Sequence, residues 1–361
     1  MKAPEKAAEV KAPEQAAEVK PAEVEVKPAV PPPQLAGVAT RTFTVGGKPL
    51  TASLTTSKAS LMVREPGYAI LEFVGDGVEL EVAWMGRNGM GRPDNYRVTL
   101  FGPDGAALAV PDAGPQFGGQ SWHVTPTAAK PFEQRLMLAH WVEGLAPGKH
   151  TVHVETMVRA HRVGDAAWQE LQVALDVPLE VVADDPAALG ALIIKLGDQA
   201  VGTNYDESEE AIRQLGVIRD PRVVAQWLRI VAQPSYTHKQ SAVRGLAAWP
   251  DDAALAAIVQ VTRTQAADLP ADRYTTEELR VQSAGQLRLT AAQALADSKH
   301  PGASAALLGL KADPDSSVRL TVLHHAAKIS EPAGLEIIRL YTRDAAQIVR
   351  GEAERYLRER R

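Results

Sequence analysis

The sequence contains no cysteine among its 361 residues. It therefore has no disulfide framework, no thiolate ligand for a metal and no cysteine nucleophile. Long apolar runs are missing as well. The best of them, residues 189–196, contains Lys195 and is far shorter than the roughly 20 residues that span a bilayer. We expect neither a disulfide-rich domain nor a membrane-spanning helix.

An excess of positive charge is also lacking, because the net charge is −5. A chain of this charge has no overall basic field to attract nucleic acid phosphates or an anionic membrane. Arginines do gather at the C-terminal end, but Glu352, Glu354 and Glu359 lie among them, which is typical of a solvated helix. We expect no nucleic-acid partner.

Common catalytic signatures are absent, including His-Glu-x-x-His, Gly-x-Ser-x-Gly, the P-loop and the dinucleotide fingerprint. His150 and His153 lie three residues apart on a predicted strand and so point to opposite faces. His324 and His325 are adjacent on a predicted helix and cannot hold one ion without other ligands. The glycine-rich segment 85–92 leads into another strand, which predicts a hairpin loop. We predict no catalytic residue, no metal, no cofactor and a protein that is not an enzyme.

Residues 1–36 form a low-complexity segment, in which Lys-Ala-Pro-Glu-Lys-Ala-Ala-Glu-Val is followed by a near copy of itself. Alternating Lys and Glu with many prolines predicts a disordered, extended spacer, with a reach on the order of 100 Å at about 3.1 Å per residue. Similar spacers follow anchors and signal sequences in bacterial envelope proteins. We expect a periplasmic or envelope location, with tethering through a leader or anchor ahead of residue 1. The alternative is a cytoplasmic protein.

Residues 37–184 show alternating apolar and polar side chains in short runs separated by Gly, Pro and Asp turns. This pattern predicts an all-β sandwich. The segment 145–155, Leu-Ala-Pro-Gly-Lys-His-Thr-Val-His-Val-Glu, resembles the start of the last strand in immunoglobulin-like and fibronectin-like modules, which implies their topology. Strands are predicted at 41–45, 68–73, 78–84, 96–101, 120–124, 133–141, 150–158, 168–177 and 179–182.

Residues 185–361 carry an arginine that recurs every 31 residues, with an insertion of 13 between the second and third positions. Each arginine follows an aliphatic residue on a predicted amphipathic helix, and a shorter amphipathic segment precedes each of these helices. A fixed period of this length predicts an α-solenoid, here of five helical hairpins. The first helices are predicted at 189–196, 223–231, 255–261, 303–310 and 335–340, and the arginines are Arg213, Arg244, Arg288, Arg319 and Arg350.

An acidic residue precedes some of these arginines by six positions, as Asp313 precedes Arg319 and Asp344 precedes Arg350. This pattern resembles the HEAT-repeat family, particularly the short bacterial repeats also found in phycobilisome lyases. The resemblance implies an Asp–Arg ladder that fixes neighbouring units. Glu207 before Arg213 matches in charge. His238 before Arg244 and Gln282 before Arg288 depart from the pattern, so we expect smaller effects of substitution at those two arginines.

The predicted function is that of a non-catalytic scaffold or adaptor that binds a protein partner through the solenoid. We expect the second helices to line a concave side and to present Gln293, His324 and Arg355. The insertion, at 264–283, offers Arg273 and Tyr274 as further candidates, because loops often carry binding residues.

Two alternatives remain. The sandwich binds carbohydrate if some of its tryptophans at 84, 122, 141 and 168 are exposed rather than in the core. The resemblance to phycobilisome lyases implies a tetrapyrrole-handling protein.

Overall fold

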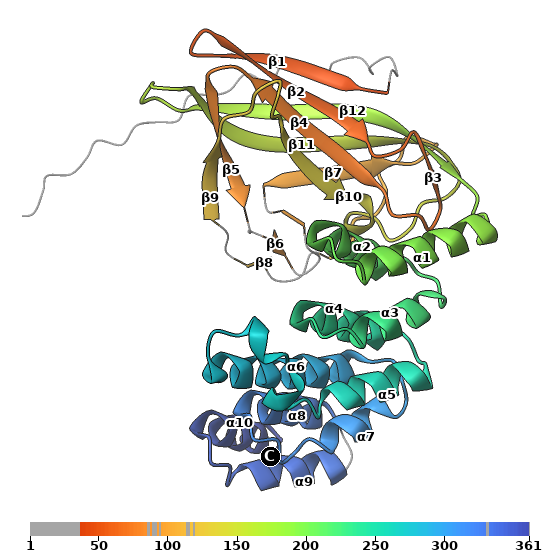
Figure 1. The fold of residues 1–361 in the computed structure, drawn as a ribbon, viewed down its shortest axis with the longest axis vertical. Helices are drawn as coiled ribbons and strands as arrows, with labels where there is room; N and C mark the ends of the chain where they lie inside the picture. The colour runs from red at the N-terminus through yellow and green to blue at the C-terminus, as the bar shows by residue number, and fades with distance from the viewer. Residues whose placement is uncertain are drawn as a thin grey trace, which may run out of the picture. The chain divides into compact units, whose positions relative to one another are not determined.

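The computed structural model describes residues 37–84, 87–88, 92–93, 95–112, 116–117, 120–329 and 332–360. The predicted spacer at 1–36 and most of the segment 85–92 lie outside these residues. Residues Leu35–Arg361 form one compact unit, in which strands come first and helices follow (Figure 1). The fold class predicted for these residues is confirmed, whereas the boundary at 184–185 stays a prediction.

One antiparallel sheet has the order β1-β2-β4-β10. Its strands are β1 (Ala39–Val45), β2 (Lys48–Thr56), β4 (Tyr68–Gly75) and β10 (Phe132–Met137). Gly46 and Gly47 join β1 to β2 with φ values of 53° and 76°, a left-handed turn that glycine adopts without strain and that matches the twist of a hairpin. The predicted strand at 133–141 is wrong at its end, because the short 3-10 helix η1 (Leu138–His140) follows Met137.

The second sheet has the order β3-β12-β11-β5-β9, and β7 also pairs with β11. The predicted strands at 168–177 and 179–182 are in fact one strand, β12, which continues through Pro178. The strands are β3 (Ser60–Met62), β5 (Val78–Trp84), β7 (Tyr96–Phe101), β9 (Gln120–Val124), β11 (Gly148–Arg162) and β12 (Gln169–Val182), and a separate pair is β6 (Arg87–Asn88) with β8 (Gln116–Phe117).

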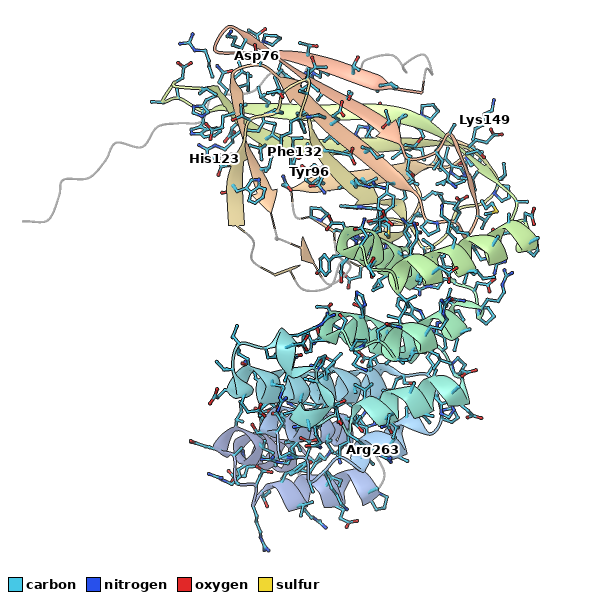
Figure 2. All side chains as sticks on the ribbon, in the orientation of Figure 1. Asp76, Tyr96, His123, Phe132, Lys149 and Arg263 are labelled. Carbon is cyan, nitrogen blue, oxygen red and sulfur yellow. The ribbon has the colours of Figure 1, made fainter. Side chains whose placement is uncertain are left out.

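The two large sheets bury their inner faces against each other. Alternate residues of β2 and β4, such as Leu54 and Phe73, share one core with Leu80 of β5 and Val154 of β11, and each of the four is fully buried. Burying each such side chain contributes roughly 1.5 to 3 kcal/mol. The solvent side of β11 is mostly polar apart from the exposed Met157, and Lys149 marks one end of it (Figure 2).

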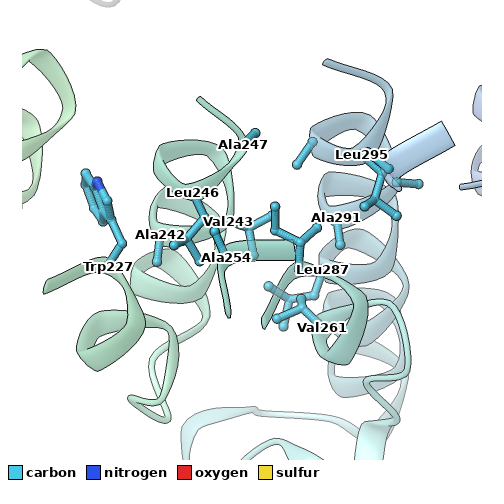
Figure 3. Close-up of a cluster of buried hydrophobic side chains, with 14 of the residues drawn as sticks. Trp227, Ala242, Val243, Leu246, Ala247, Ala254, Val261, Leu287, Ala291 and Leu295 are labelled. Carbon is cyan, nitrogen blue, oxygen red and sulfur yellow. The ribbon is translucent and has the colours of Figure 1, made fainter. Parts of the chain in front are cut away.

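The helical region consists of antiparallel pairs with a shared core. Trp227 and Leu246 belong to this core (Figure 3). Its buried residues come from all the pairs. The helices are α1 (Pro186–Ala200), α2 (Tyr205–Val217), α3 (Val223–Val231), α4 (Tyr236–Ala247), α5 (Asp252–Val261), α6 (Glu277–Asp297), α7 (Ala303–Leu308), α8 (Ser316–Lys328), α9 (Pro332–Tyr341) and α10 (Gln347–Glu359).

Asp220, in the turn before α3, is a charged residue only 4% exposed. Its carboxylate accepts hydrogen bonds from Arg222 at 2.8 and 2.9 Å and from Arg64, in the loop after β3, at 3.0 Å. Arg64 also donates to Asp184 at 2.5 Å. The hydrogen bonds from Arg222 lower the pKa of Asp220 to about 2, against the opposing effect of burial. These ion pairs connect the strand-rich and helical regions.

Asp220 makes stability depend on pH in the acid range. The pKa of this carboxyl is lower in the folded protein than its ordinary value of 3.8. Its ion pairs therefore contribute fully above about pH 4, and the contribution is lost as the pH falls from about 4 toward 2. In urea titrations over this range, Asp220→Asn should show a shallower loss of stability than the parent. The exposed Asp76, replaced by Asn, provides the control and should leave the slope unchanged. A parent slope in Asp220→Asn would contradict the assignment.

Candidate functional site

Two of the recurring arginines reach forward to the next helical pair. Arg319 of α8 donates from Nε and Nη2 to the two carboxylate oxygens of Asp344, at 2.8 Å each. Arg288 of α6 donates from Nε to Asp313 at 3.1 Å and from Nη1 to the Thr264 carbonyl at 3.1 Å. A guanidinium that donates two parallel bonds to a carboxylate fixes direction as well as distance. These contacts fix how one pair stacks on the next.

The same aspartates also organise the turns in which they lie. Asp344 accepts from the Ala346 N–H, and its backbone carbonyl accepts from Arg350 at 2.5 Å. The Arg319 and Asp344 side chains are 13% and 7% exposed. Hydrogen bonds from Arg319 lower the pKa of Asp344, so the pair stays ionised at neutral pH. Asp344 therefore connects α8, the turn and α10.

The other predicted ladder residues make different contacts. Arg213 pairs with Glu210 of its own helix at 3.0 Å, and Glu207 accepts from the Asn204 amide in the cap of α2. Arg244 is exposed and makes no ion pair within the described part of the chain.

One rule accounts for these differences: each arginine takes its partner from the acidic position of the following unit. That position holds His238 after Arg213 and Gln282 after Arg244, so neither arginine finds a carboxylate there. Arg288 does find a carboxylate, Asp313 of the next unit, although Gln282 stands at the acidic position of its own unit. The smaller effect expected for substitution of Arg288 stays a prediction. The acidic position of an arginine's own unit therefore does not decide whether that arginine has a carboxylate partner. The acidic position of the following unit decides it.

The insertion is shorter as a loop than predicted. It contains the 3-10 turns η2 (Ala266–Asp268) and η3 (Ala271–Arg273), and α6 already begins at Glu277, so residues 277–283 are helical rather than loop. Leu269 is 2% exposed, and Tyr274 is half-buried against the helical core. Arg273 is exposed, whereas Tyr274 is held mainly by packing.

The three residues predicted to contact a partner lie on α6, α8 and α10. Gln293 and His324 are exposed, and Arg355 is half-exposed. Arg355 donates to Glu352 at 2.6 Å and to Glu359 at 2.7 Å, and its guanidinium lies 4.3 Å from the centre of the Tyr356 ring. The His324 ring meets Tyr356 edge to face at 6.1 Å. Contacts between α8 and α10 therefore hold His324 and Arg355 in one cluster.

Sequence reasoning missed six other positions on the same face. Relative to the recurring arginine, Gln293, His324 and Arg355 stand at +5, and positions −2 and +1 point the same way at 100° per residue. These nine positions are called the outer face. All are exposed or half-exposed, and they are Gln286, Leu289, Gln293, Ser317, Leu320, His324, Ile348, Gly351 and Arg355. The 31-residue period that located the arginines also locates these positions.

All three positions are exposed or half-exposed together in the last three units and not in α2 or α4. In α2 and α4 the corresponding −2 residues, Ala211 and Ala242, are buried at 2% and 0% exposure. The charge of the outer face is low, because Arg355 is the one residue of the nine that is always charged. The centres of protein interfaces are depleted in charged residues, which suits this composition.

The histidines and tryptophans of the sandwich are engaged in local contacts. His150 bonds to the Ala146 carbonyl at 2.8 Å, and His153 lies between Asp176 and Glu155. Trp141 is 7% exposed, whereas Trp122 of β9 is 49% exposed, and Trp168 stacks on His161 at 4.1 Å. Within the described ranges no group of three or more histidine, aspartate or glutamate side chains is placed to hold a metal ion. The side chain of Trp84 lies outside the described residues.

A family model for HEAT repeats matches residues 275–358, which include α6 to α9, α10 up to its penultimate residue and all nine positions of the outer face. The C-terminal helical region therefore contains HEAT repeats, as the arginine period predicted. No curated protein matches the chain. Among the described residues, no helix has both the length and the apolar character needed to cross a membrane. HEAT repeats point to a solenoid of the interaction or scaffold type.

Proposed function

We propose that this protein is a non-catalytic adaptor whose outer face on α6, α8 and α10 binds a protein partner. The observation that carries the proposal is the regular, charge-poor outer face, which recurs at 31-residue intervals in the units matched as HEAT repeats. Solenoids use such repeated surfaces to bind extended partners.

The chemistry of the outer face defines the partner. Leu289 and Leu320 are half-exposed at its centre, Ile348 is 61% exposed, and Gln286, Gln293 and Ser317 supply uncharged hydrogen-bonding groups. A complementary surface is aliphatic and uncharged at its middle. The part of the partner that lies opposite α10 faces a cluster in which Arg355 is already paired with Glu352 and Glu359. Rim charges of this kind affect association rate and specificity more than affinity.

Site-specific photo-crosslinking in the native cells tests the proposal. A photoreactive amino acid at position 293 or 324 of the full chain should give one discrete protein adduct, and the same label at the exposed position 336 on α9 should not. We also place the interaction in the periplasm or envelope, because of the composition of residues 1–36, so the adduct should occur in that fraction.

A charge variant makes the test specific. The double variant Gln293→Glu/His324→Glu places two charges on the outer face, and binding of an uncharged partner would have to desolvate both. With the photoreactive amino acid at position 286, the amount of adduct should therefore fall by about tenfold or more. Ala333→Glu, exposed on α9, is the matched control and should leave the adduct unchanged. Equal adducts from positions 293, 324 and 336, or none from the first two, would show that the outer face is not the binding surface.

A further inference from the structure

Strand β1 lies at one edge of the first sheet, because the strand order there is β1-β2-β4-β10. Figure 1 shows it along the upper rim of the strand-rich region. Among the described residues β1 pairs with β2 on one side and with no strand on the other, which is called the free edge. Such an edge presents a row of backbone N–H and C=O groups with which another strand can pair.

The hairpin between β1 and β2 decides which residues present their backbone groups at the free edge. Gly46 and Gly47 form its two-residue turn, and Val45 lies opposite Lys48. The two residues that close such a turn exchange both backbone hydrogen bonds, and bonded and non-bonded pairs alternate from there along the strands. Odd-numbered residues of β1 therefore bond to β2, and even-numbered residues direct their N–H and C=O groups to the free edge. These even-numbered residues are Thr40, Thr42 and Thr44.

A side-chain contact across the hairpin agrees with this assignment. The hydroxyl oxygens of Thr42 and Thr51 lie 3.1 Å apart. Side chains of opposite residues lie closer together in non-bonded pairs than in bonded pairs, which fits Thr42 and Thr51 as a non-bonded pair. The backbone N–H of Thr42 therefore points away from β2.

The free edge has few of the features that prevent pairing. Its three threonines are exposed, and β1 has seven residues with no proline and one charge, Arg41. Natural edge strands are commonly protected by charges, by proline or by short length. The opposite edge of the same sheet, β10, exposes Glu133 and Arg135, and the edge strand β3 of the second sheet has three residues. Of these three edges, β1 is the least protected.

The sequence of β1 is complementary to a second copy of itself. With a two-fold axis at Thr42, two antiparallel copies place Thr40 opposite Thr44 and Thr42 opposite Thr42, and each of the three pairs exchanges about two hydrogen bonds. On the other face of the ribbon, Arg41 lies opposite Phe43 of the second copy. Arg41 already lies over its own Phe43 ring, 5.0 Å from the centre, so this contact suits both side chains. An axis at Arg41 would instead place two arginines directly opposite each other, which is unfavourable.

We infer that two copies of this chain pair through their β1 strands, antiparallel and centred on Thr42, to form a symmetric dimer. The first sheets of the two copies then form one continuous sheet. The dimer goes beyond the proposed function and does not depend on it, because β1 lies in the strand-rich region and the outer face lies on α6, α8 and α10. A dimer carries two outer faces, so a partner with two matching sites binds it more tightly through the raised effective concentration.

Sedimentation of the full chain over about 1 μM to about 1 mM tests the inference, and it should show a reversible monomer–dimer equilibrium. Thr42→Pro removes the N–H at the free edge but no hydrogen bond to β2, and proline is tolerated in such a position. This variant should dimerise at least about tenfold more weakly. Thr42→Val keeps the N–H and is the matched control, which should dimerise as the parent does.

Single cysteines test the register, because the chain contains no cysteine of its own. Across the two-fold axis the two copies of position 42 lie about 5.5 Å apart at Cα, which is within the reach of a disulfide. Under mild oxidation Thr42→Cys should form a linked dimer. Thr40→Cys, which is also exposed, should form a linked dimer only when it is mixed with Thr44→Cys.

Any one of three results would overturn the inference. The full chain stays a monomer throughout the series, as expected if another segment of the same chain covers the free edge. Thr42→Pro dimerises as tightly as the parent. Thr40→Cys alone forms a linked dimer as fast as Thr42→Cys does, a result that decides the question even if Thr42→Pro does not fold.

Discussion

Replacing Arg319 with alanine is expected to destabilise the helical region by about 3 to 5 kcal/mol, because it leaves the buried Asp344 carboxylate without its two hydrogen bonds. In a solenoid each unit is stabilised mainly by its neighbours, so the damage should be local. Hydrogen exchange should show faster opening of α8 to α10, with little change in β2 and β4. Urea titration gives the total loss.

Arg244→Ala is the matched control for this prediction. Arg244 occupies the same position of its helix but is exposed and has Gln282 at the acidic position of the next unit, so the expected loss is below about 1 kcal/mol. Arg288→Ala should fall between the two, because Arg288 is buried but makes one bond to Asp313 instead of two. Equal losses at Arg244 and Arg319 would mean that the carboxylate contact does not fix the stack.

Trp227→Ala should also cost about 3 to 5 kcal/mol, because it removes the largest fully buried side chain of the helical core (Figure 3). Trp227 of α3 packs directly against Gly245 of α4, where an added methyl group would lie 2.4 Å from the indole. Gly245→Ala should therefore cost about 1 to 3 kcal/mol through overpacking. Tyr205→Ala, at a site 63% exposed, is the control and should change stability by less than about 1 kcal/mol.

The double variant is the decisive part of this prediction. Once the indole is gone, the new methyl group at position 245 occupies vacated space, so Gly245→Ala should cost much less in the Trp227→Ala background. The two losses are then not additive, as expected for residues in contact. Additive losses in urea titrations would show that the two positions act separately.

The helical half could be predicted well because one residue type recurs at a fixed interval. The arginine period placed the second helices, and α3 was predicted at its observed bounds of 223–231. The period did not predict whether each arginine contacts a carboxylate of its own unit or of a neighbouring one. Asp313 stands six residues before Arg319 in the sequence, yet its carboxylate contacts Arg288 of the preceding unit. Only the stacking of units decides which neighbour an arginine meets.

The strand-rich half was predicted less completely. β2 was missed although Leu50, Ala52 and Leu54 alternate in it and are fully buried, because Thr and Ser between them weaken the apolar signal. The pairing of both β5 and β7 with β11 was not predictable from spacing at all, because such pairing is a tertiary property.

The forward contacts of Arg288 and Arg319 have a consequence for how such a chain changes length. A segment such as 313–343 carries an acceptor for the segment before it and a donor for the segment after it. A gene duplication that copies the whole segment therefore creates a new junction whose two sides already match. A junction that lacks the carboxylate, as between Arg244 and Gln282, offers no such ready-made match. Duplication of a whole segment is accordingly easiest within α7 to α10, where no neighbouring residue has to change for the added unit to form its ion pairs.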